Sequence, residues 1–317
     1  MSKLLLHARS SLPALRTLSR FDTVRTVSAT DISTFVKEGS MQGRVLWRYG
    51  VESKPIHLFV RERKQRRAST PDIVAHLSTN EFPSKSFISL GEGVYASSPE
   101  FCFLQMADEL DYIDLIRYGY ELCAGYMLDD SAPGGFVQSG MLTDTRKLKS
   151  YLGRIPWWRV CRKATIALNY IADGSRSPRE TALAMSLCLP TRWGGYQLPK
   201  PELNYKIDVG FDIEGFSNRY VDLYWPNKSF GIEYESTLIH ADQEKMTHDS
   251  VREKILKEQG VQLLRVTKEE LSNPLRYELI VKLTARALGR KNRPAKSSVA
   301  KARRALAHRL FAPHREI

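Results

Sequence analysis

The chain has 317 residues, of which 42% are hydrophobic, so it is long enough for two domains that each bury a core. Its 48 Lys and Arg residues outnumber its 35 Asp and Glu residues, and the net charge of +13 favours a polyanionic partner. No apolar run reaches the ~18 residues that a membrane-spanning helix needs, so we expect no membrane partner.

The cysteines give an expectation for the compartment. Cys102, Cys123, Cys161 and Cys188 are widely spaced and include no C-x-x-C pair. This spacing fits reduced, mostly buried thiols and gives no sign of zinc. We therefore expect a cytoplasmic protein without disulfide bonds.

The first 172 residues predict a leading segment followed by a mixed domain. Residues 1–45 show no regular pattern and are expected to be irregular. Residues 46–172 form the predicted α+β N-terminal domain. Its elements are expected as strands at 46–49, 56–60 and 85–90 and as helices from Ser98 onward and at 115–126, 143–151 and 157–172. Asp173-Gly174 marks the expected end of this domain.

A second domain is predicted from residue 173 to residue 288. Ser177 followed by Pro178 is typical of a helix start, with serine as the N-cap and proline at the first helical position. The segment 219–235 then predicts a β-hairpin whose turn is Pro226–Ser229.

The register of this hairpin follows from its apolar side chains. If the numbers of facing residues sum to 455, one face of the hairpin is wholly apolar. That face holds three pairs: Val221 with Tyr234, Leu223 with Ile232, and Trp225 with Phe230. A slip by one residue would mix apolar and charged side chains on both faces, which supports this register.

Acidic side chains gather on the other face of the hairpin. Asp222 lies opposite Glu233, and Glu235 follows two residues later. Facing side chains on paired strands are about 5 Å apart, where two like charges destabilise a sheet. A divalent cation with oxygen ligands would offset this repulsion, so the pattern predicts a metal site. The alternative is a solvated acidic strand face that binds no metal.

The segment after the hairpin predicts a crossover to a parallel strand. A helix is expected at about 242–259 and a short apolar strand at 261–266. Thr267 and Glu270 fit a capping box that begins another helix. A strand, a crossover helix and a second strand usually form a parallel pair.

Residues 289–317 are predicted to be a basic tail. From Arg286 to the end there are ten Lys or Arg residues and one acid, and 300–311 fits a basic amphipathic helix. Lys301, Arg303 and Arg304 would contact phosphate groups without reading base sequence, so binding should weaken with salt. A solvated tail and a helix that docks on an acidic partner are the alternatives.

Several short motifs follow one another between Asp173 and Leu288. They are Ser177-Pro178-x-Glu180, Asp222, Glu233-x-Glu235, His240, Asp249-x-x-Arg252, Leu256, Gly260 and Leu264-Arg265-Val266-Thr267. Together they resemble the very-short-patch-repair-like and uncharacterised bacterial nuclease domains of the restriction-endonuclease-like (PD-(D/E)XK) superfamily. The resemblance implies an α/β fold with a C-terminal αβββαβ core. The region from Phe87 to Leu128 weakly resembles the middle of antitoxin-like proteins that often carry this domain.

The resemblance also implies a chemistry, because members of the superfamily cut phosphodiester bonds with a divalent metal. Asp222 and Glu233 would hold Mg²⁺ or Mn²⁺, with Glu180 or Glu235 as a third carboxylate. His240 would position the scissile phosphate or transfer a proton, and Arg252 would contact phosphate. DNA is the expected substrate, and RNA is the other candidate.

One departure from the superfamily pattern leaves the activity open. The pattern usually has a lysine where this chain has Glu235. A site without lysine must rely on the metal to lower the pKa of a water, or take a base from elsewhere. The second interpretation is therefore a non-catalytic DNA-binding regulator or antitoxin built on a degenerate nuclease core. A third is a protein-interaction module.

Structural roles also remain open for the single residues. Glu180 fits a capping glutamate, and Glu235 fits a solvent-facing acid. His240 fits a hydrogen-bonded loop histidine, and Arg252 fits a partner of an acid on its own helix, such as Asp249.

Overall fold

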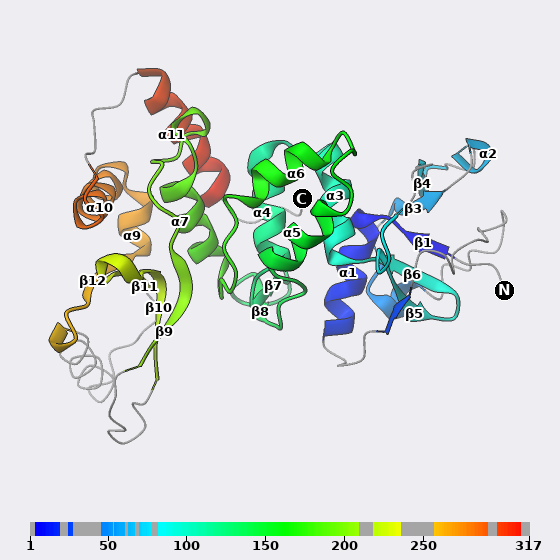
Figure 1. Cartoon of the computed structure of the whole chain (residues 1–317), viewed down its shortest axis with the longest axis horizontal. Coiled ribbons are helices and arrows are strands. Elements are labelled where there is room, and N and C mark those ends of the chain that lie inside the picture. Colours follow the sequence, from blue (N-terminus) through cyan, green and yellow to red (C-terminus); the bar gives the residue numbers. More distant parts are fainter. Residues whose placement is uncertain are drawn as a thin grey trace. The chain divides into compact units, whose positions relative to one another are not determined.

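The computed structural model describes residues 4–19, 25–27, 46–52, 54–60, 63–66, 70–77, 82–208, 218–235, 257–290 and 297–311. The chain is a mixed α/β protein that divides into two compact units (Figure 1). Unit 1 comprises residues 1–123 and 139–171, and unit 2 comprises residues 124–138 and 172–317. None of the described helices has both the length and the apolar character needed to cross a membrane.

Unit 1 contains a six-stranded mixed sheet with the strand order β2-β5-β6-β1-β3-β4. The strands are β1 (Leu4–Leu6), β2 (Arg25–Val27), β3 (Ile56–Val60), β4 (Ile73–Leu77), β5 (Phe87–Gly91) and β6 (Val94–Ser97). Strand β1 runs parallel to β6 and antiparallel to β3, and β3 runs parallel to β4. The strands predicted at 56–60 and 85–90 are confirmed.

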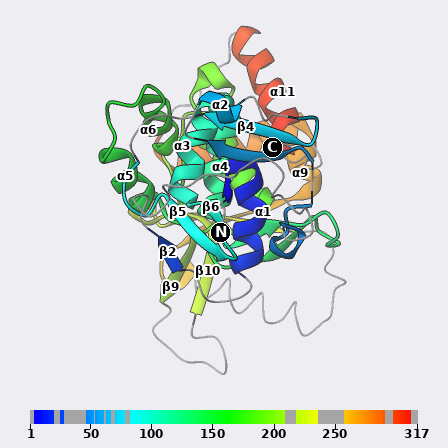
Figure 2. The ribbon, with the colours of Figure 1, turned by 90° about the vertical axis from the view of Figure 1, so that its right-hand side faces the viewer.

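The irregular leading segment expected at residues 1–45 is wrong for its first part. Leu4–Leu6 forms β1 inside the sheet, and Ala8–Ser19 forms helix α1, which contacts β6 (Figure 2). A strand of three residues is too short to show the alternation of apolar and polar residues that identifies a strand in a sequence. Only its pairing with β3 and β6 identifies Leu4–Leu6 as a strand. Residues 46–49, predicted as a strand, form the 3-10 helix η2 (Leu46–Tyr49) instead.

Unit 1 contains further helices, and α3 (Pro99–Glu109) contributes a ring to an aromatic core. The others are α2 (Arg63–Arg66), α4 (Tyr112–Leu122), α5 (Thr145–Gly153) and α6 (Cys161–Leu168). Ser98 caps α3 as predicted, because its side chain accepts a hydrogen bond from the backbone of Phe101. Phe101 is buried and meets Phe59 and Phe87 edge to face, in the geometry that aromatic rings prefer.

Unit 2 contains a four-stranded sheet with the order β12-β11-β10-β9. The strands are β9 (Glu202–Asp208), β10 (Asn218–Trp225), β11 (Phe230–Glu235) and β12 (Gln262–Thr267). Strand β10 is antiparallel to β9 and β11, whereas β11 and β12 are parallel, as the predicted crossover requires. The crossover helix predicted at 242–259 lies almost wholly outside the described residues.

Helix α7 (Pro178–Cys188) and a short hairpin complete the first part of unit 2. Ser177 caps α7 as predicted, and ten of the helix's eleven residues are buried. The hairpin of β7 (Tyr126–Leu128) and β8 (Phe136–Gln138) comes from a segment that the sequence assigns to the N-terminal domain. The Tyr126 hydroxyl, 3.1 Å from Thr181 Oγ1, ties this hairpin to α7.

Among the described residues, three helices follow β12 in unit 2. They are α9 (Lys268–Ser272), α10 (Pro274–Ala287) and α11 (Ser297–Phe311). The capping box of Thr267 and Glu270 at the start of α9 is confirmed in both of its hydrogen bonds.

The helix predicted at 300–311 is confirmed, but α11 is not a separate tail. It packs against α7 and the 3-10 helix η3 (Thr191–Trp193), as Figure 1 shows in red beside green. Leu306 and Leu310 are buried, and the Phe311 carbonyl accepts a hydrogen bond from Arg179. Gly194, at φ +91°, lets the α11 backbone approach so closely that a Cβ would lie 2.3 Å from the Ala302 oxygen. The basic helix α11 therefore also has an apolar side, which packs against the rest of unit 2.

We expect Leu306→Ala to lower the free energy of unfolding by about 2–5 kcal/mol, because it leaves a cavity under α11. Arg304→Ala, at an exposed position of the same helix, should change it by less than about 0.5 kcal/mol. Urea unfolding followed by circular dichroism measures both. Equal effects of the two substitutions would contradict the packing role of α11.

Candidate functional site

The predicted pairing of β10 with β11 is confirmed at the turn end of the hairpin. Trp225 faces Phe230 and Leu223 faces Ile232, in the register whose numbers sum to 455. The turn residues form the 3-10 helix η4 (Pro226–Lys228), and Ser229 closes it with φ +43°. The backbone hydrogen bonds of two strands therefore fix which side chains approach one another.

Farther along the hairpin, the predicted alternation of faces is wrong at Val221. Val221 packs in one cluster with Tyr224, three residues away, and a Cβ on Gly231 would lie 2.5 Å from Val221 Cγ1. Residues three apart lie on opposite faces of a regular strand, so alternation is broken around Asp222. The Asp222 carboxylate turns toward β11, where Oδ2 accepts a hydrogen bond of 2.8 Å from the Tyr234 backbone N–H.

The two acids of β11 lie beside a cation from β12. Glu233 pairs in register with Arg265 and is only 9% exposed, whereas Glu235 is more exposed. The Arg265 Nε lies 3.3 Å from Glu235 Oε1. The positive charge of the Arg265 guanidinium offsets the repulsion between the acidic side chains of β11. A bound metal ion is therefore not the only group that could offset repulsion between acids here. The sequence interpretation missed Arg265, although the predicted parallel crossover was a signal for it.

Glu180 is held by hydrogen bonds at the start of α7. Its Oε2 accepts hydrogen bonds from the Arg176 backbone N–H at 2.9 Å and from Asn204 Nδ2 at 2.7 Å, and its Oε1 accepts one from the Ser177 hydroxyl. Burial raises the pKa of Glu180 above its ordinary value, although these hydrogen bonds oppose the shift. Asn204, another residue that the sequence did not single out, adopts φ +46°, a conformation that asparagine tolerates.

The predicted metal ligands do not form one close group. Among the described residues, the groups of three or more His, Cys, Asp or Glu ligand atoms mutually within 4.8 Å do not include Glu180, Asp222 or Glu233. Asp222 and Glu233 are nevertheless on adjacent strands with hard oxygen donors. His240 and Arg252, predicted for proton transfer and phosphate contact, lie outside the described residues.

The three predicted phosphate-binding residues of α11 have different environments. Lys301 and Arg304 are exposed. Arg303 is mostly buried: its Nη1 lies 3.2 Å from Glu278 Oε1, and its guanidinium lies 3.9 Å from the centroid of the Tyr196 ring. This cation is used inside unit 2, so only the other two present their charge to solvent.

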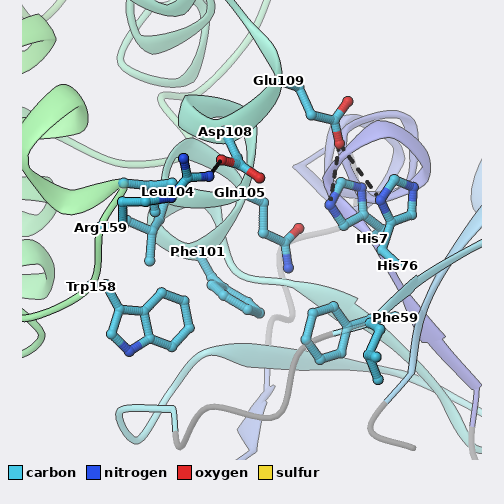
Figure 3. A pocket seen from close by; sticks show the side chains of 12 residues that line it. His7, Phe59, His76, Phe101, Leu104, Gln105, Asp108, Glu109, Trp158 and Arg159 are labelled. Carbon is cyan, nitrogen blue, oxygen red and sulfur yellow. Dashed lines mark hydrogen bonds and ion pairs between the residues drawn. The ribbon is translucent and has the colours of Figure 1, made fainter. Parts of the chain in front are cut away.

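A second group of polar side chains, in unit 1, was not predicted. His7, His57 and His76 each place one ring nitrogen within 4.8 Å of the others. His7 and His76 also line a pocket of about 440 Å³ together with Glu109, Asp108 and apolar side chains (Figure 3). Burial is the main reason that the pKa of each histidine is lowered, which favours the neutral form of each ring.

The chain was compared with protein families, curated proteins and solved structures, and no family model, curated protein or solved structure matches it.

We expect Asn204→Gly to lower the free energy of unfolding by about 1.5–3 kcal/mol, because a buried carboxylate loses a charge-assisted donor. Glycine accepts the positive φ, so backbone strain does not add to the loss. Thermal and urea unfolding with and without Mg²⁺ measure it, with Asn227→Gly in the exposed turn as the control. A loss that appears only with Mg²⁺ would contradict the hydrogen-bonding role and indicate that Glu180 binds the ion.

Proposed function

We propose that unit 2 is a restriction-endonuclease-like domain that hydrolyses phosphodiester bonds of DNA with Mg²⁺ or Mn²⁺. The order of its described elements supports this proposal: helix α7, strands β9, β10 and β11, then the parallel strand β12. This is the order that the αβββαβ core of the resemblance requires, with the crossover helix outside the described residues. The observation that carries the proposal is the pair Asp222 and Glu233 on adjacent strands β10 and β11.

The donor atoms of this pair fit the ion. Carboxylate oxygens are the ligands that Mg²⁺ and Mn²⁺ prefer, and Glu233 is nearly buried while Asp222 is partly exposed. When bound, the ion would lower the pKa of a water for attack on phosphorus and stabilise the leaving oxygen. The Glu180 carboxylate is hydrogen-bonded to Asn204 and to the backbone at the start of α7. The other ligands of the ion would therefore be oxygens of water or substrate.

The side chains of this chain would then position the substrate and hold charge. The Tyr234 N–H holds one oxygen of Asp222, which fixes the direction of that carboxylate. Arg265 of β12 provides a fixed positive charge beside Glu235, the position at which the superfamily pattern has a lysine, and it pairs in register with Glu233. A guanidinium stays protonated, so Arg265 would stabilise negative charge on phosphate but would not act as a base.

The second candidate function is a non-catalytic, DNA-binding regulator. Two observations favour it: Glu180 is used as a hydrogen-bonded helix-start residue, and Arg265 already neutralises Glu235. In this candidate, the exposed cations of α11 bind phosphate groups and no metal is needed.

The nuclease proposal predicts metal-dependent scission of nucleic acid by the full chain. Plasmid, single-stranded DNA and RNA would be incubated with Mg²⁺, Mn²⁺ or a chelator. Asp222→Asn and Glu233→Gln keep the shape of each side chain but remove its charge. We expect each to slow scission more than about a hundredfold, because even outer partners of metal ligands are worth 10- to 100-fold.

The matched control for this experiment is Glu202→Gln, which neutralises an exposed acid of β9. It should leave the rate of scission unchanged. Scission that persists with a chelator, or that is equal in all three variants, would contradict the proposal. Cleavage of RNA and not of DNA would show that the substrate is RNA, while the proposed active site would stay the same.

The regulator predicts salt-sensitive binding that needs no metal. The affinity for a labelled duplex would be measured by fluorescence anisotropy at several salt concentrations. Replacing both Lys301 and Arg304 by Gln should reduce the slope of log affinity against log salt by about 2, since each phosphate contact contributes about 0.9. Replacing Arg146 and Lys149 of unit 1 by Gln removes the same charge from exposed positions and is the control. Equal slopes for the two double variants would contradict binding through α11.

A further inference from the structure

The histidine cluster of unit 1 is assembled by its sheet. His7 follows β1, His57 belongs to β3 and His76 belongs to β4, which are neighbours in the order β1-β3-β4. The His7 backbone N–H donates to the His57 carbonyl at 2.9 Å, and the His7 and His76 rings stack with centroids 3.7 Å apart. Residues from three distant parts of the sequence therefore bring their ring nitrogens to one place.

One carboxylate lies near two of these rings. Glu109, the last residue of α3, places Oε1 at 3.6 Å from His7 Nε2 and 3.7 Å from His76 Nδ1 (Figure 3). Its other oxygen accepts a hydrogen bond of 2.6 Å from Arg9 Nε, which holds the carboxylate in position. Histidines that bind a metal commonly direct their second ring N–H to a carboxylate, and Glu109 is placed to accept such a hydrogen bond after a small shift of its side chain.

One of the ring nitrogens, His7 Nδ1, has no hydrogen-bond partner among the described residues, and His57 Nδ1 and His76 Nε2 are hydrogen-bonded to each other. His7 is only 4% exposed, and its Nδ1 is buried without a hydrogen-bond partner among the described residues. Such a nitrogen is costly to leave unpaired, which points to an atom that occupies this position. His76 Nε2 lies 2.8 Å from His57 Nδ1, a hydrogen bond that joins the remaining two rings.

We propose that His7, His57 and His76 bind a divalent transition-metal ion, with zinc as the best fit, through His7 Nδ1, His57 Nδ1 and His76 Nε2. Neutral imidazole nitrogens suit zinc, cobalt and nickel, whereas Mg²⁺ and Ca²⁺ prefer oxygen ligands. The pocket that His7 and His76 line gives the ion a way in and leaves room for a water as fourth ligand.

Binding requires the rings to reorient, because His7 and His76 stack at an interplanar angle of 5° and the in-plane lone pairs of parallel rings do not converge on one ion. Two nitrogens that each lie about 2.0–2.1 Å from a tetrahedral zinc are roughly 3.3 Å apart. The His57 and His76 nitrogens, now 2.8 Å apart, would separate by about half an ångström as the metal replaces their hydrogen bond. The side chain of His76 is 25% exposed, so its ring has space for this movement.

The experiment measures metal binding by the full chain without a histidine tag, after treatment with a chelator and dialysis. Zn²⁺ would be titrated by calorimetry, and Co²⁺ would be followed by its visible ligand-field absorption. We expect one tight site per chain, with an absorption spectrum of a four-coordinate ion with nitrogen ligands. His76→Gln and His57→Gln should each weaken binding more than about 100-fold, and Glu109→Gln should weaken it about 10- to 100-fold.

Three controls keep the test specific. His308→Gln removes an exposed histidine of α11 and should leave the affinity unchanged. Asp222→Asn in unit 2 should also leave it unchanged, which separates this site from the proposed nuclease site. Circular dichroism of each metal-free variant identifies substitutions that unfold unit 1, and Glu109→Gln then serves as the milder probe.

Two results would overturn the proposal. One is no binding of Zn²⁺ or Co²⁺ up to millimolar concentrations, which would leave a cluster of hydrogen-bonded neutral histidines. The other is binding that is unchanged in His57→Gln, His76→Gln and Glu109→Gln, which would place the ion elsewhere.

Discussion

The parallel pairing of β11 with β12 is the constraint on which the candidate site of unit 2 depends. It brings Arg265 into register with Glu233 and within ion-pair distance of Glu235. Like charges on one strand face destabilise a sheet, and a guanidinium on the neighbouring strand offsets that cost. The charge of Glu235 is therefore compensated without a bound cation. Metal dependence, and not the position of the acids, therefore separates the nuclease proposal from the regulator proposal.

In unit 1 the pairing of neighbouring strands also brings polar side chains together, here histidines in place of acids. The strand order β1-β3-β4 gathers three imidazoles, and Glu109 of α3 approaches two of them. The two sites differ in donor chemistry, since unit 2 offers oxygen atoms and unit 1 offers nitrogen atoms. Oxygen ligands favour Mg²⁺ or Mn²⁺, and nitrogen ligands favour zinc. One chain would then hold two different ions for separate purposes.

The reach of sequence reasoning differs from element to element. The hairpin register at Trp225 and Leu223 could be predicted, because apolar periodicity and turn residues are local signals. The caps at Ser177 and Thr267 are local for the same reason. The face of Val221 could not be predicted, because the break in alternation arises from packing against other strands.

The basic run at the end of the sequence predicted a helix but did not predict which of its side chains are buried. Arg303 lies against Tyr196 and Glu278, and Leu306 is buried beneath the helix. Long cationic side chains cover apolar surface with their methylene groups, so a basic segment can also be a packed one.

The sequence by itself determined the local features: helix starts, the acidic hairpin, the parallel crossover and an overall basic charge. Only the tertiary structure decided that Leu4–Leu6 is an inner strand, that Arg265 lies beside the acids, and that His7, His57 and His76 meet. The physical reason is separation along the chain. Periodicity and capping act over a few residues, whereas strand order joins segments about 20 to 90 residues apart and leaves no local pattern at either end.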